Sequence, residues 1–142
     1  MKIIKVLECS SKGDKRFSAF YARVSIKGVE KSIECWYQSA KRDEYGRVPG
    51  KGKRVNHMIN PFNGHKLPAN CLSDFYTCLW IRYFTKHPEL LEYAKGFDEF
   101  NDMFRGKCIN CQADIIRECT KDFIGLKNKV MTGEFYKDCK GE

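Results

Sequence analysis

Hydrophobic residues recur at helical spacing in several stretches of this chain. The strongest stretch runs from Ser73 to His87, where apolar and aromatic side chains trace one face of a helix. It ends there because the residue before a proline, here Pro88, resists the helical region. Similar patterns predict further helices, the first with Ser32 as its N-cap, over residues 32–42, 89–95 and 110–121, with a weaker helical tail after them.

Two segments near the N-terminus, residues 2–9 and 17–26, predict extended strands, and glycine-containing turns follow both. Residues 43–70 are rich in glycine, proline, asparagine and basic residues, which predicts a long basic loop. We therefore expect a single domain over residues 1–142 with an α+β fold. In this fold, a short antiparallel N-terminal sheet packs on a mainly helical body.

The composition is that of a globular protein with a basic surplus. Hydrophobic residues make up 42% and charged residues 31% of the chain, which is ordinary for a soluble domain. Lysine and arginine outnumber acidic residues by 26 to 18, and this surplus favours anionic partners such as nucleotides or nucleic acid. The apolar block at residues 1–7 is short and broken by Lys5, so we expect no signal peptide, and no run approaches the roughly 18 apolar residues of a membrane span. We expect a cytoplasmic protein that does not bind membranes.

The chain has eight cysteines, and nothing in it suggests export, so we expect free thiols rather than a disulfide framework. Cys35, Cys78 and Cys119 lie in helix-like apolar patterns, where a thiol packs as a small hydrophobe. The one metal-like spacing is Cys108-x-x-Cys111, and the second ligand pair that a structural zinc site needs is missing. No metal and no cofactor are expected.

One candidate site is the turn at residues 11–16. It places a glycine and a hydroxyl between Lys12, Lys15 and Arg16, and this combination can cradle a phosphate. The turn lacks the spacing of a Walker loop. Taken alone, the turn is better explained as a solvated hairpin.

Two further clusters combine charges with polar groups. Glu34, Gln38 and Lys41 share one flank of the predicted helix over residues 32–42, where they could orient a sugar, hold a water and meet a phosphate. Residues 98–107 join three carboxylates to a glycine turn at the expected start of a helix, which could combine an acid with anion binding. By spacing alone, an ordinary helix surface is the better explanation of the first cluster, and a charged surface loop explains the second equally well.

Several phrases of the chain together match a known pattern. The first three are Phe17-Ser18-Ala19-Phe20-Tyr21, Ile26-Lys27-Gly28 and Ile33-Glu34-Cys35-Trp36-Tyr37-Gln38-Ser39-Ala40-Lys41. Later matches are Tyr83-Phe84, Pro88-Glu89-Leu90, Asp102, Gly106, Asn110 and Arg117. In this order they resemble the NADAR, or YbiA-like, family of N-glycosidases, which act on NAD- and ADP-ribose-related compounds. The family usually has asparagine at the position of Ala19 and tryptophan-glycine near Arg105.

The resemblance implies a YbiA-like fold and hydrolysis of the C1–N glycosidic bond in a ribosyl-nucleotide or ADP-ribosyl conjugate. It implies Glu34 as the catalytic carboxylate, with Asp102 second, and Gln38 and Asn110 as residues that position the ribose or the water. The other substrate-binding residues that it implies are Lys12, Lys15, Arg16 and Lys41 on phosphates, Trp80 or Tyr37 on the base, and Phe20 and Arg105.

Two other functions remain open. The differences from the family at Ala19 and near Arg105 favour a non-catalytic protein that binds and sequesters an ADP-ribose- or nucleotide-derived ligand. Nucleic-acid binding through Lys51-Gly52-Lys53-Arg54 ranks third, because the aromatic residues lie mostly at core spacing. The sequence indicates neither the leaving base nor the oligomeric state.

Overall fold

The computed structural model describes residues 3–101 and 112–132, with side chains through Lys129 in the second range. Within these residues the helices are α1 (Ile33–Ala40), α2 (Leu72–Lys86), α3 (Pro88–Ala94) and α4 (Gln112–Thr132). The strands are β1 (Val6–Glu8), β2 (Arg23–Ile26), β3 (Val29–Ser32), β4 (Lys41–Arg42), β5 (His57–Ile59), β6 (Lys66–Pro68) and β7 (Glu99–Asn101). Short 3-10 turns cover Lys15–Phe17 and Ala69–Cys71. The predicted α+β class is confirmed.

The predicted helices are present within a few residues of their expected bounds. Ser32 is the N-cap of α1, as predicted, and its Oγ accepts a hydrogen bond of 3.1 Å from the Cys35 N–H. α4 leaves helical geometry at Asp122, close to the predicted end of a helix at Lys121. The Asp122 carboxylate accepts from the Gly125 N–H at 2.9 Å and so caps the helical turn that follows.

The strand pairing differs from the expected antiparallel N-terminal sheet. β1 pairs in parallel with β7, with Leu7 opposite Phe100, and does not pair with β2. The backbone of Lys5 fixes this pairing, since its N–H donates to the Asp98 carboxylate at 2.9 Å and its carbonyl accepts from the Asp98 N–H at 2.8 Å. The antiparallel pair in this region is β2 with β3, and β3 was not among the predicted strands; of the strand predicted over residues 17–26, only Arg23–Ile26 is extended in a sheet.

The segment predicted as a long loop over residues 43–70 contains two strands, β5 and β6, which form a small sheet with β4 just before it. β4, β5 and β6 pair in that order in antiparallel fashion, with Met58 opposite Leu67. Both of these side chains are buried, and this burial is what orders a stretch rich in glycine and proline. Irregular backbone is confined mainly to the β4–β5 connection, residues 43–56.

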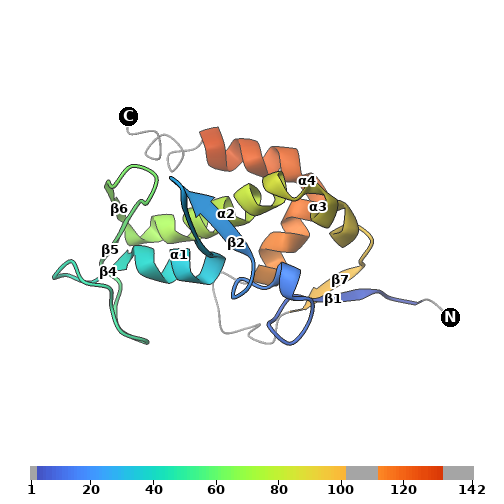
Figure 1. Ribbon diagram of the computed structural model, residues 1–142, viewed down its shortest axis with the longest axis horizontal. Helices are drawn as coiled ribbons and strands as arrows, with labels where there is room; N and C mark the ends of the chain where they lie inside the picture. The colour runs from blue at the N-terminus through green and yellow to red at the C-terminus, as the bar shows by residue number, and fades with distance from the viewer. Residues whose placement is uncertain (1–2, 102–111, 133–142) are drawn as a thin grey trace.

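The core surrounds α2, which crosses the middle of the molecule between α1 and α4 (Figure 1). Trp80 and Phe84 stack there with ring centroids 5.7 Å apart, and Phe17 reaches the same cluster from the N-terminal segment. The β4–β5–β6 sheet lies at one end of the molecule and the β1–β7 pair at the other (Figure 1). Among the described residues, no helix is both long and apolar enough to cross a membrane.

Candidate functional site around the first helix

The family-like phrase at residues 17–21 lies directly against the start of α1. The carbonyl of Ala19 accepts from the Glu34 N–H, and that of Ala22 accepts from the Ile33 N–H, both at 2.9 Å. Together with the Ser32 cap on Cys35, these contacts satisfy the first amides of the helix. The N-terminal end of α1 therefore offers few free backbone N–H groups to an anion, so what this end can bind depends on its side chains.

A third segment joins this contact from far along the chain. The Ala19 N–H donates to Oε1 of Gln112, the first residue of α4, at 2.7 Å, and both residues are buried. Ala19 is thus held on one side by α1 and on the other by α4. Gln112 was not among the predicted site residues; its only signal is a polar residue at the start of an apolar helical pattern.

Glu34 and Gln38 of the predicted flank lie together on α1, whereas Lys41 lies just beyond the helix in β4. Glu34 is half-buried, and the Gln38 amide donates to its Oε1 at 2.8 Å, which holds the carboxylate in one orientation. One turn further on, the Lys41 ammonium lies 4.6 Å from the centre of the Tyr37 ring. The Tyr37 ring is in turn held against Tyr76, with centroids 4.9 Å apart.

Exposed aromatic rings extend this flank. Phe20 and Tyr21 follow Ala19 and are 50% and 49% exposed, so their rings are available to a ligand. The Lys15 ammonium lies 4.8 Å from the centre of the Tyr21 ring, which places the basic turn beside the phrase. Lys12 is exposed on the same turn.

The conformation of that turn requires a glycine. A Cβ on Gly13 would overlap the backbone oxygen and side chain of Glu8, since the turn folds back closely on β1. The Gly13 N–H also donates to the Ser10 carbonyl at 3.0 Å, and the Asp14 N–H to the Glu8 carbonyl at 3.1 Å. The glycine predicted as part of a phosphate cradle is therefore needed for the chain to make this turn.

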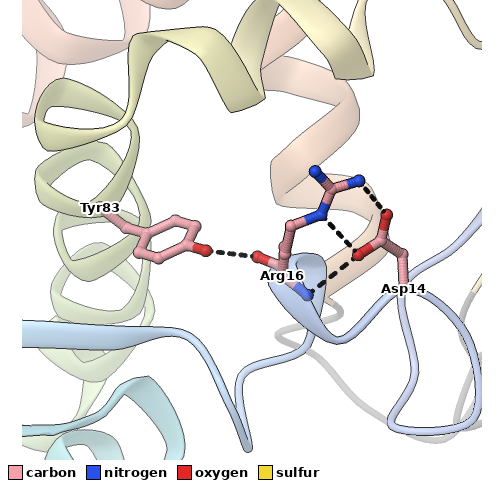
Figure 2. Close-up of polar contacts among 3 residues, drawn as sticks. All are labelled: Asp14, Arg16 and Tyr83. Carbon is pink, nitrogen blue, oxygen red and sulfur yellow. Dashed lines mark hydrogen bonds and ion pairs between the residues drawn. The ribbon is translucent and has the colours of Figure 1, made fainter.

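Arg16 is engaged within the protein (Figure 2). Its Nε and Nη2 donate to the two carboxylate oxygens of Asp14 at 3.0 and 2.7 Å, and its backbone N–H also donates to Asp14, at 3.1 Å. The Tyr83 hydroxyl donates to the Arg16 carbonyl at 2.7 Å and so links the turn to α2. We call these three residues the Asp14–Arg16–Tyr83 clasp.

Two residues of the clasp have shifted pKa values, for different reasons. The hydrogen bond from the Arg16 side chain lowers the pKa of Asp14, against a smaller opposing effect of burial. Burial raises the pKa of Tyr83 to about 12. The Arg16 guanidinium also lies 4.8 Å from the centre of the Tyr93 ring. The charge of Arg16 is thus paired with Asp14 in the folded chain, and its predicted phosphate contact stays a prediction.

The prediction that Trp80 stacks on a base is wrong. Its side chain has 0% exposure and packs between Tyr83 and Phe84 in the core. Among the described residues, its Nε1 has no hydrogen-bond partner. Helical periodicity alone does not distinguish a core tryptophan from one that borders a pocket; Tyr37, the alternative, does border the α1 flank.

Three predicted site residues, Asp102, Arg105 and Asn110, lie outside the described residues, as do Cys108 and Cys111. Across residues 3–101 and 112–132, no group of histidine, cysteine and carboxylate side chains could hold a metal ion.

Two of the described cysteines, Cys35 and Cys119, are free thiols. Cys119 is buried, as predicted, and burial raises its pKa to about 12. Cys78 is half-buried, and Cys35 is exposed instead of packing in the core, because it lies opposite the buried stripe of α1.

Comparison with models of known protein families finds none that matches this chain, and comparison with curated protein sequences finds no match either. The NADAR resemblance therefore stays a prediction. What the chain can do has to be argued from the geometry of the α1 flank.

Proposed function

We propose that this protein is an N-glycosidase-like hydrolase that cleaves the C1–N bond of a ribosyl-nucleotide or ADP-ribosyl conjugate. The observation that carries the proposal is the Glu34–Gln38 pair, with its 2.8 Å hydrogen bond, on an open flank of α1 beside the 17–21 phrase. A YbiA-like fold, with Asp102, Arg105 and Asn110 completing the site, belongs to the same proposal.

Cleavage of a C1–N glycosidic bond develops positive charge on the ribose in an oxocarbenium-like transition state. A fixed carboxylate stabilises that charge or activates the attacking water, and it does so more strongly where water is partly excluded. Glu34 is half-buried and oriented by Gln38, so it fits this role. The Gln38 carbonyl oxygen remains on the same flank to accept from a ribose hydroxyl.

The surroundings of Glu34 suit the rest of such a substrate. The half-exposed rings of Phe20 and Tyr21 offer faces to a base, and Tyr37 lies one turn along α1. Lys15 and Lys41 provide cations at the two ends of this group, each against a tyrosine ring. They would bind the phosphates of a nucleotide, with Lys12 on the adjacent turn.

The test compares Glu34→Gln with a matched carboxylate. Glu89 is also an acidic residue in the first turn of a helix, α3, so Glu89→Gln controls for the loss of a charge at a helix start. Free base released from an ADP-ribosylated nucleobase and from free ribosyl-nucleotides is measured by chromatography and mass spectrometry. We expect loss of turnover in Glu34→Gln alone. Unchanged turnover in that variant would remove Glu34 as the catalytic carboxylate.

A non-catalytic binder is the second candidate, and the burial of Ala19 favours it. Its methyl group offers no hydrogen bond where the family has an asparagine, and its backbone groups are already bonded to Glu34 and Gln112. The purified protein is mixed with the same compounds, the complex is isolated by gel filtration, and heating then releases what the protein holds. Release of intact ligand supports the binder, whereas recovery of free base supports the hydrolase.

A further inference from the structure

The β4–β5 loop, residues 43–56, belongs to the most basic part of the chain. Residues 41–68 carry seven lysine or arginine side chains against two carboxylates, so they hold +5 of the total net charge of +8. This segment lies at the end of the molecule away from the β1–β7 pair, and its loop projects outward (Figure 1). Charge is therefore concentrated on one end of the protein, which attracts polyanions there.

The cations of this loop form no ion pair with any residue in the part of the chain that the structure describes. Arg47, Lys51, Lys53 and Arg54 are exposed. Asp43, the nearest carboxylate to Arg47, accepts hydrogen bonds of 2.9 Å from the backbone N–H groups of Tyr45 and Arg47. It shapes the turn and does not bind a cation.

That turn presents an aromatic ring to solvent. The Asp43 hydrogen bonds and the positive φ of Gly46 place Tyr45 at the tip, where it is 76% exposed. A second turn, closed by the Lys53 N–H on the Gly50 carbonyl at 3.0 Å, carries Lys51. The backbone thus holds an exposed ring and exposed cations close together in sequence.

A hollow of about 380 Å³ lies between these turns. Its walls include Tyr45, Lys53, Arg54 and Asn56, together with the carboxylates of Asp43 and Glu44. A ring, cations and an amide around one hollow match the needs of an unpaired nucleotide, whose base stacks on an aromatic face while its phosphates meet cations.

We propose that the β4–β5 loop binds single-stranded polynucleotide, with Tyr45 stacking on a base and Arg47, Lys51, Lys53 and Arg54 contacting phosphates. A duplex fits less well, because its bases are already stacked on one another and are not free to cover Tyr45. The proposal does not depend on glycosidase activity, since the loop carries none of the residues assigned to that reaction.

The test measures the fluorescence anisotropy of a short labelled oligonucleotide of mixed sequence, as RNA, as single-stranded DNA and as duplex DNA. Full-length protein is titrated between about 50 and about 200 mM salt. We expect both single strands to bind more tightly than the duplex, and the ratio of RNA to DNA affinity reports the preferred sugar. Equal affinity for the duplex would overturn the stacking arrangement.

Variants separate local contacts from bulk charge. The loop variant carries both Lys53→Gln and Arg54→Gln. The control variant carries both Lys86→Gln and Lys121→Gln, and so loses the same charge from exposed helical positions elsewhere. For single strands, each lost phosphate contact lowers the slope of log affinity against log salt by about 0.7, so the loop variant loses about 1.4 and the control does not. Equal effects of the two double variants would reduce the binding to net charge.

The ring is tested by its own pair of variants. Tyr45→Ala is expected to weaken single-strand binding about fivefold or more, while Tyr45→Phe, which keeps the aromatic face, retains affinity. Glu89→Gln should bind the oligonucleotide as the wild type does, since Glu89 lies on α3, outside the loop. Circular dichroism confirms that each variant is folded. Unchanged affinity of Tyr45→Ala for single strands would contradict the proposal. So would wild-type binding to anionic lipid vesicles that is as tight as binding to the oligonucleotide and that the Lys53→Gln, Arg54→Gln variant loses.

Discussion

Replacing Asp14 tests whether the Asp14–Arg16–Tyr83 clasp holds the N-terminal turn in place. Asp14→Ala removes the cap on the Arg16 N–H, a kind of contact that contributes about 0.5–2 kcal/mol. It also removes a two-bond ion pair in which Arg16 is half-exposed, worth about 0–1 kcal/mol once solvent screening is allowed for. We therefore expect a loss of about 1.5 kcal/mol in the free energy of unfolding.

This loss is large enough to measure by thermal unfolding. An unfolding entropy of about 2.1 cal/mol/K per residue, applied to 142 residues, converts about 1.5 kcal/mol into a fall in Tm of about 5 °C. Glu30→Ala is the control, because Glu30 forms an exposed ion pair with Arg23 at 3.1 Å and caps no helix. We expect it to cost less than about 1 kcal/mol. Equal losses in the two variants would refute the contribution of the cap.

The charge of Asp14 is tested separately by Asp14→Asn, which keeps a capping oxygen. The pKa of Asp14 is lowered in the folded protein from its ordinary value of 3.8, so its charge stabilises the folded state above that value. The stability difference between wild type and Asp14→Asn should be fully present near neutral pH. It should shrink as the pH falls below 3.8 and through the lowered pKa. A difference that stays constant down to the acid transition would contradict the ion pair.

Three further predictions follow from buried groups. Tyr83→Phe should cost about 0.5–1.5 kcal/mol by urea unfolding; because the pKa of Tyr83 is raised to about 12, the stability advantage of the wild type over the variant should shrink from about pH 10 upwards. Gln112→Leu should cost about 1–3 kcal/mol by leaving the buried Ala19 N–H without an acceptor, and Gln112→Glu, which keeps an acceptor oxygen, should cost less. Brief iodoacetamide treatment at neutral pH, followed by peptide mass spectrometry, should label Cys35 and leave Cys119 unmodified, since burial raises the Cys119 pKa to about 12. Equal labelling of both thiols, or no difference between the Gln112 variants, would contradict these contacts.

Local signals in the sequence were sufficient for the helices. The apolar period and Pro88 predicted α2, the Ser32 cap predicted the start of α1, and a weakening pattern near Lys121 matched the break in α4 at Asp122. All of these depend on residues within a few positions of one another, where spacing and capping act. The same local spacing placed Glu34 beside Gln38, and their hydrogen bond is present.

Pairing between distant segments was decided by the tertiary structure. The parallel partner of β1 lies 93 residues along the chain, and the contact between Lys5 and Asp98 that fixes it has no local sequence signal. For the same reason, the contact between Ala19 and Gln112 could not be anticipated from either segment alone.

Which partner each charged or aromatic side chain contacts was also decided by the tertiary structure. A half-exposed arginine has similar local neighbours whether it binds a phosphate or a carboxylate of its own chain, and folding placed Arg16 on Asp14. A tryptophan on an apolar helical face borders a pocket or fills the core according to what packs over it, and Trp80 is covered by the core. The sequence by itself determined which segments form helices and which residues share a face. Partners were decided only by folding, because hydrogen bonds, ion pairs and burial depend on contacts between segments far apart in the chain.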